Sequence, residues 1–143
     1  MRAVLLVDDE IPMLEAVSGM FVARGWDVTT SGNGTDAVAR ARERDFDLVV
    51  SDVVMEGIVG TALLEEIRAV SGTYVPVIFM SNMPERRVRG IIEGEYGFLR
   101  KPFRGDDLMR AVSAVLGMPD PDMGGGMVPP AGHGHSSEGR FVR

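Results

Sequence analysis

The sequence alternates between short apolar runs and segments with helical spacing, and this alternation restricts the fold more than any other feature. Five runs have the character of strands, the second and fifth more weakly: AVLLV (3–7), WDVTT (26–30), DLVVS (47–51), VPVIFM (75–80) and GFLR (97–100). A strand that is apolar at every position is covered on both faces, as in a parallel sheet packed between helices. The runs therefore predict a buried parallel sheet.

Between these runs, apolar residues recur three or four positions apart, as they do on one face of a helix. Three sets are clear and two are weaker: Leu14, Val17 and Phe21; Leu63, Leu64, Ile67 and Val70; Leu108, Val112, Val115 and Leu116; then Val38 with Ala41, and Val88 with Ile91 and Ile92. Five repeats of strand and helix predict an α/β fold with a doubly wound, five-stranded parallel sheet, helices on both faces and right-handed crossovers.

The chain divides into one domain and a tail. Its 143 residues suffice for a single domain of ordinary size, which we expect over residues 1–117. Residues 118–143 are rich in Gly and Pro and lack apolar periodicity, which predicts a flexible tail. Two histidines in this tail, His133 and His135, have no third ligand at a fixed position, so we expect no metal site there.

Charge and composition exclude several classes of function. The net charge is -6, which argues against a direct nucleic-acid partner, because phosphate binding needs a concentrated basic face. The chain contains no cysteine, so disulfides and thiolate chemistry are absent. The first apolar run stops at Asp8, and no stretch approaches the ~20 apolar residues of a membrane span. We therefore expect a cytoplasmic protein that does not bind membranes.

Polar and charged residues follow four of the predicted strands. They are Asp8, Asp9 and Glu10 after the first strand, Asp52 after the third, Ser81 after the fourth and Lys101, the single lysine of the chain, after the fifth. Ligands of open parallel sheets bind at the carboxyl ends of the strands, where these residues should meet.

Each feature has an ordinary structural explanation when it is taken alone. Acidic residues 8–10 suit the start of a helix, Asp52 suits a turn, Ser81 suits a helix cap, and Lys101 could be a surface cation. Together, however, clustered carboxylates repel one another unless a cation neutralises them, and oxygen ligands of this kind suit Mg²⁺. The pattern therefore favours a divalent metal site.

These motifs, taken in order, resemble those of a known family. The series VDDE (7–10), D-x-x-M-x-x-x-x-G (52–60), a serine after an apolar strand and KPF (101–103) resembles the receiver domain of two-component response regulators. The resemblance covers residues 2 to about 117, and VIFMSNMPE with FLRKPF is most similar to receivers associated with hybrid histidine kinases. It implies a flavodoxin-like fold with strand order 2-1-3-4-5.

The resemblance also implies the chemistry of the site. Asp52 would accept a phosphoryl group from a histidine kinase or a histidine phosphotransfer protein. Asp9, Asp52 and the backbone carbonyl of Val54 would bind Mg²⁺ directly, while Asp8 would act through a metal-bound water. The chain would catalyse only its own phosphorylation and dephosphorylation, so it would not be an enzyme in the ordinary sense.

The remaining motif residues would sense the phosphoryl group. Ser81 and Lys101 would each contact one phosphoryl oxygen, and Phe98 would occupy the family's switch-aromatic position. Phosphorylation would draw Ser81 inward and let Phe98 turn in behind it, which would alter a protein-interaction surface and permit a phosphorylation-dependent homodimer. Pro102 would follow a cis peptide bond.

Some positions depart from the family pattern. Glu56 replaces the usual proline, Asn82 replaces a small residue, and the short interval from Ser81 to Lys101 predicts a short fourth helix. Glu56 and Asn82 leave open a pseudo-receiver that binds partners without phosphorylation. Val54 and Met83 stand where side chains often orient the hydrolytic water, and neither holds water well, so we expect a long-lived phosphorylated state.

Enzymes on the same architecture fit less well. A flavodoxin needs a phosphate cradle after the first strand, where residues 8–10 would repel the phosphate of FMN. A haloacid-dehalogenase-type phosphatase needs a D-x-D nucleophile pair after the first strand, whereas the candidate nucleophile here follows the third and has Val54 in the place of a second Asp.

Overall fold

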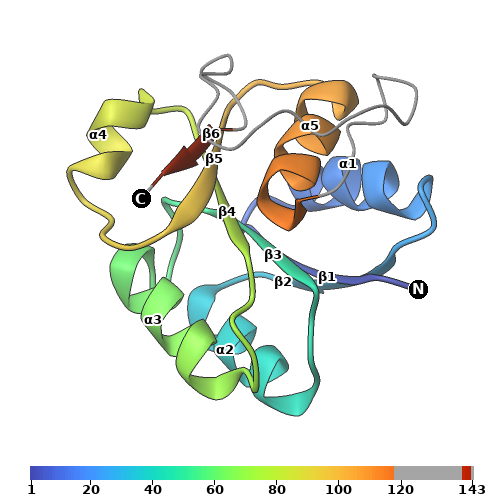
Figure 1. Ribbon diagram of the computed structural model, residues 1–143, viewed down its shortest axis with the longest axis horizontal. Helices are drawn as coiled ribbons and strands as arrows, with labels where there is room; N and C mark the ends of the chain where they lie inside the picture. The colour runs from blue at the N-terminus through green and yellow to red at the C-terminus, as the bar shows by residue number, and fades with distance from the viewer. Residues whose placement is uncertain (118–139, 143) are drawn as a thin grey trace.

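The computed structural model describes residues 1–117 and 140–142 (Figure 1). The described elements are β1 (Ala3–Val7), α1 (Ile11–Val22), β2 (Asp27–Ser31), α2 (Gly34–Glu43), β3 (Leu48–Asp52), α3 (Gly60–Val70), β4 (Val77–Ser81), α4 (Glu85–Arg89), β5 (Tyr96–Arg100), α5 (Gly105–Leu116) and β6 (Arg140–Val142). The predicted tail residues 118–139 and 143, with His133 and His135, lie outside this description.

The sheet has the order β2-β1-β3-β4-β5-β6. Its first five strands are parallel in the order 2-1-3-4-5, which confirms the predicted α/β fold. The sixth strand, β6, pairs antiparallel with β5 and was not predicted, because it comes from the segment expected to be a tail. The strand bounds differ from the apolar runs by one or two residues: β4 begins at Val77, and β5 includes Tyr96.

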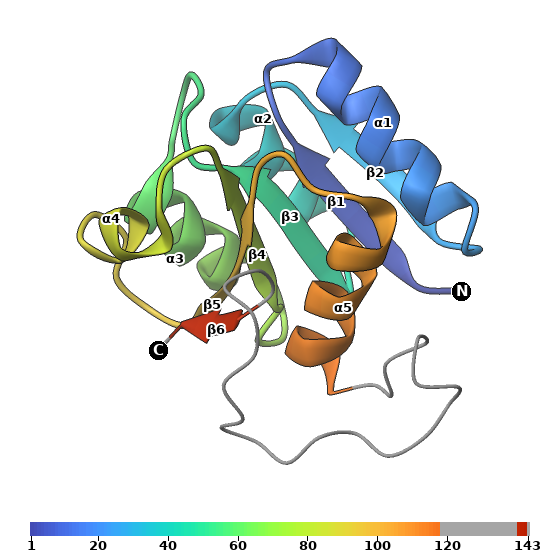
Figure 2. The same cartoon turned by 90° about the horizontal axis from the view of Figure 1, so that it is seen from above.

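Helices cover both faces of the sheet. Figure 2 shows α1 and α5 on one face, with α2 and α3 on the other. Successive residues of β1 point to opposite faces, so Val4 and Leu6 pack in the core beneath α1 and α5, while Leu5 and Val7 pack in the core beneath α2 and α3. This two-sided burial is the reason that β1 reads as a continuous apolar run.

The helices follow the predicted pattern with one exception. As expected, α4 is short, with five residues. The prediction that its apolar face continues through Ile91 and Ile92 is wrong, because the helix stops at Arg89 before Gly90, a residue with low helix propensity. Ile92 is nevertheless buried in the core, whereas Ile91 is exposed. Within the described residues, every helix is too short or too polar to cross a bilayer.

Candidate functional site

The carboxyl ends of four parallel strands bring the predicted site together. Asp8 directly follows β1, Asp52 ends β3, Ser81 ends β4, and Lys101 directly follows β5. The register aligns these ends: Asp52 lies opposite Met80 on β4, one residue before Ser81. Parallel strands that end at the same level place the residues that follow them in one crevice.

Lys101 connects the strand ends through its ammonium group. Its Nζ atom lies 3.3 Å from Oδ2 of Asp8, 3.2 Å from Oδ2 of Asp52 and 3.9 Å from Oε1 of Glu10. The lysine is 8% exposed and Asp8 is 0% exposed, so this is a buried ion cluster rather than a surface pair. The backbone N–H of Lys101 donates to the carbonyl of Ser81 at 2.8 Å, and the Lys101–Pro102 bond is cis, as predicted.

Three carboxylates surround the ammonium group. Oxygens of Asp8, Glu10 and Asp52 lie within 4.8 Å of one another, a separation from which they could hold a metal ion. Glu10 was expected at this edge of the sheet, but it was not among the metal ligands that the resemblance implied. Its backbone N–H donates to Oδ1 of Asp8 at 2.9 Å, and this turn places the glutamate beside Asp8 and Asp52. Asp9 is exposed and lies outside the group, so its direct metal ligation stays a prediction.

Burial and neighbouring charges together raise the pKa of both Asp52 and Lys101, which disfavours the charged form of the aspartate and favours that of the lysine. Burial raises the pKa of Asp52, and the neighbouring charge of Asp8 adds to this, while Lys101 opposes it. For Lys101, burial alone would lower the pKa, but the carboxylates of Asp52 and Asp8 outweigh burial and raise it. The lysine is therefore protonated at neutral pH. Ionisation of the Asp52 carboxyl, in contrast, costs more free energy in this site than in water.

The remaining predicted residues lie near this cluster. The backbone N–H of Val54 donates to Oδ1 of Asp52 at 3.3 Å, and Val54 as a residue is 67% exposed. Oγ of Ser81 accepts a hydrogen bond from the backbone N–H of Met83 at 2.9 Å. Phe98 is buried in the core beneath α2 and α3, so an inward turn of this ring on phosphorylation stays a prediction.

The loop after Asp52 is held by the first residue of α2, Gly34. The backbone N–H of Gly34 donates to the carbonyl of Glu56 at 3.2 Å, and a Cβ atom on Gly34 would lie 1.6 Å from the carbonyl oxygen of Ile58. Only glycine permits this approach. Although Glu56 replaces a proline, the loop is thus anchored by its neighbour, and the sequence alone did not reveal the contact.

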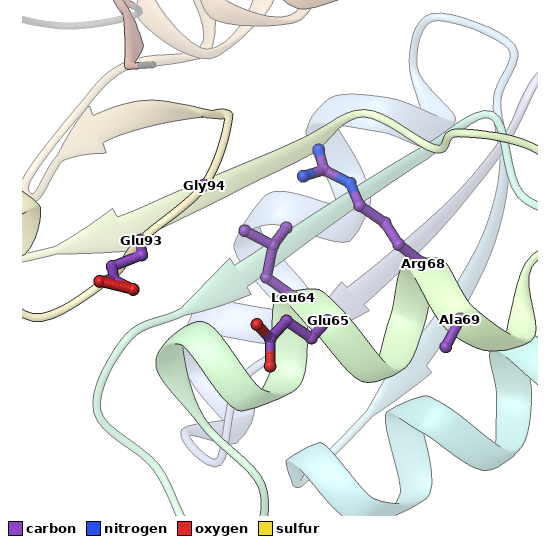
Figure 3. Close-up of a pocket in the computed structure, with 6 residues that line it drawn as sticks. All are labelled: Leu64, Glu65, Arg68, Ala69, Glu93 and Gly94. Atoms are coloured by element: carbon purple, nitrogen blue, oxygen red, sulfur yellow. The ribbon is translucent and has the colours of Figure 1, made fainter.

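A separate shallow pocket lies between α3 and the segment before β5 (Figure 3). Its lining residues are Leu64, Glu65, Arg68, Ala69, Glu93 and Gly94, none of which belongs to the carboxylate cluster. The Arg68 guanidinium stacks on the Tyr74 ring at 4.0 Å, and its Nε donates to the carbonyl of Val75 at 3.3 Å. These two contacts occupy the Arg68 guanidinium, so the pocket adds no reactive group to the site.

Comparison with known proteins agrees with this geometry. The model of the response regulator receiver domain family matches residues 4–113. The chain therefore belongs to the response regulator receiver domain family, the signalling domain of two-component systems.

Individual relatives include transcriptional regulatory proteins and proteins with solved receiver or chemotaxis structures. The chain is 37% identical over 118 residues to the transcriptional regulatory protein CpxR homolog of Haemophilus influenzae, which covers 81% of this chain and 51% of that protein. Among solved structures, the receiver domain of the hybrid histidine kinase CckA is 33% identical with a TM-score of 0.65, over 80% of this chain and 98% of that one. The chemotaxis protein CheY4 of Vibrio cholerae is 29% identical with a TM-score of 0.71, over 81% and 99%. The chain spans about half the length of the first curated relatives that it matches.

Proposed function

We propose that this receiver domain accepts a phosphoryl group on Asp52 from a histidine kinase or a histidine phosphotransfer protein. The observation that carries the proposal is the position of the Lys101 ammonium between Asp8 and Asp52, at 3.3 and 3.2 Å. In the transfer, a carboxylate oxygen of Asp52 bonds to phosphorus, the P–N bond of the phosphohistidine breaks, and its electron pair leaves with the imidazole nitrogen.

The carboxylates around Lys101 fit a divalent cation. Asp8, Glu10 and Asp52 place three oxygens within 4.8 Å of one another, within reach of one ion. Asp9 and the backbone carbonyl of Val54 would add the remaining ligands that the family leads us to expect. When bound, Mg²⁺ would neutralise the negative charge that gathers on the transferring phosphoryl oxygens. Asp8 and Asp9 would hold that ion beside the Asp52 carboxylate.

Two side chains would recognise the phosphorylated state. Lys101 would turn from the Asp52 carboxylate to a phosphoryl oxygen, because both are anions within reach of its flexible stem. Ser81 would donate its hydroxyl proton to another phosphoryl oxygen, which is compatible with its bond from Met83, in which the same oxygen accepts. Phe98, which lies opposite Phe79 on β4, would respond through the packing of its ring in the core.

The output would be contact with another protein in the cytoplasm. The responding surface would comprise α4, β5 and α5, and the partner would be a downstream protein or a second phosphorylated copy. The net charge of -6 favours a protein over nucleic acid as the direct target.

Beryllofluoride, which mimics a phosphoryl group on a carboxylate, tests the proposal. We expect Mg²⁺-dependent binding that shifts the amide resonances of Ser81 and Lys101, with no response in the matched variant Asp52→Asn. A folded wild-type protein that shows no Mg²⁺-dependent response would favour the pseudo-receiver, which binds partners without phosphorylation.

A further inference from the structure

The outer edge of β5 is covered by a strand from a distant part of the chain. β5 pairs with β4 on its inner side, and on its outer side Tyr96, Gly97 and Phe98 lie opposite Val142, Phe141 and Arg140 of β6. Figures 1 and 2 both show β6 beside β5 at the end of the sheet. Without β6, this side of β5 would present a row of unpaired backbone N–H and C=O groups.

The sequence of β5 makes this edge receptive to pairing. The strand reads YGFLR, and its one charged residue, Arg100, lies beyond the stretch that β6 covers. Exposed edges are usually protected by charged residues, proline or a bulge. The covered stretch 96–98 has neither charge nor proline and contains two aromatic residues, which favour strands. An extended segment that reaches this edge can therefore extend the sheet.

The covering strand is short enough to be displaced. β6 forms three residue pairs with β5, whereas β1 and β2 form five. Residues 118–139 connect it to the domain, so it competes for the edge as a tethered segment whose advantage is its effective concentration, on the order of millimolar. A pairing of this size opens at a small fraction of the free energy of global unfolding.

We propose that the outer edge of β5 is a strand-addition surface that residues 140–142 fill in cis, and that it accepts an extended peptide rich in aromatic and β-branched residues when this cis strand is released. The surface lies on the strand that leads directly into Lys101. The proposal does not depend on phosphorylation of Asp52, and it can fail or hold independently of the proposed function.

Hydrogen exchange of the full chain, followed by NMR, is the first test. A variant with Arg140→Pro, Phe141→Pro and Val142→Pro removes the N–H donors of β6, while a matched variant with threonine at the same three positions keeps these donors and a β-branched side chain. We expect the amides of residues 96–98 that point away from β4 to exchange about tenfold faster or more in the proline variant, and at the wild-type rate in the threonine variant. Amides of β1 and β3 serve as the internal control for folding.

A peptide in trans is the second test. The probe is the synthetic peptide SEGRFVR, which repeats residues 137–143. We expect it to shift the amide resonances of residues 96–98 in the proline variant, and to need a much higher concentration to do so in the wild type, where the cis strand competes.

Three results would overturn the proposal. Wild-type amides at 96–98 that point away from β4 and exchange at the rate of an unprotected backbone would show that the edge is open. Equal peptide binding to both proteins would show that there is no cis competition. Protection that rises with protein concentration, together with a dimer in sedimentation, would assign the covering strand to a second copy. The wild-type exchange measurement alone decides the first point even if the proline variant does not fold.

Discussion

Replacing Lys101 by methionine removes the only cation of the buried cluster and keeps the length of the stem. The ammonium lies 3.2 Å from Asp52 and 3.3 Å from Asp8, and at an effective dielectric constant of about 20 each attraction is about 5 kcal/mol before desolvation is subtracted. Without the lysine, the two carboxylates repel each other in the same site. Because burial of the lysine offsets part of the gain, we expect a net loss of about 3–5 kcal/mol in the free energy of unfolding.

Urea unfolding in EDTA at neutral pH measures this loss. The matched control is Arg44→Met, since Arg44 pairs with Asp27 at a similar distance of 3.1 Å but both side chains are 45% exposed. Solvent screens such a pair, so we expect the control to change the free energy of unfolding by less than about 1 kcal/mol. The comparison separates the effect of burial from that of losing an ion pair.

Two further measurements complete this test. The double variant Lys101→Met, Asp52→Asn should recover part of the loss, because one of the repelling charges is gone. Added Mg²⁺ should stabilise the Lys101→Met protein more than the wild type, since a cation can then enter without competing with the ammonium. If Lys101→Met costs no more than Arg44→Met, or if neither Asp52→Asn nor Mg²⁺ compensates for it, the electrostatic reasoning is wrong.

Three other perturbations have defined outcomes. Burial raises the pKa of Asp52, so ionisation of this group costs stability as the pH rises through its folded pKa; Asp52→Asn in EDTA should thus match the wild type at acidic pH and become the more stable protein towards neutral pH, as thermal unfolding across pH would show. Gly34→Ala would place a Cβ atom 1.6 Å from the carbonyl oxygen of Ile58, and we expect a loss of about 2 kcal/mol or more in urea unfolding, against little change for the control Gly32→Ala, where a Cβ meets nothing within 4 Å. The exposed, apolar Val54 cannot orient water, so Val54→Asn should shorten the lifetime of the acyl phosphate, and an unchanged decay rate would refute this role.

The sheet could be predicted from the sequence because its central strands are buried on both faces and are therefore apolar at successive positions. AVLLV of β1 packs into the cores on both faces, and strands of this kind, alternating with helices, are typical of a helix-covered parallel sheet. The convergence of Asp8, Asp52, Ser81 and Lys101 follows from the same topology, because each of them stands at a strand's carboxyl end.

Features that depend on local geometry could not be predicted from the sequence. Glu10, rather than Asp9, lies with Asp8 and Asp52 because the Asp8 side chain closes a turn with the backbone N–H of Glu10, and no periodicity encodes such a turn. β6 is three residues long, too short for an alternating pattern, and its existence depends on the open edge of β5. Gly34, the first residue of α2, carries no sequence signal of its role, because the carbonyl oxygen that occupies the space of its missing side chain belongs to Ile58, 24 positions away in the chain.

The most direct test of the phosphoacceptor role is incubation of the full chain with acetyl phosphate and Mg²⁺, followed by intact-mass and peptide mass spectrometry. We predict the addition of one phosphoryl group on Asp52, dependent on Mg²⁺ and absent from Asp52→Asn. A folded protein that gains no phosphoryl group under these conditions, or an Asp52→Asn variant that is modified to the same extent, would contradict the account.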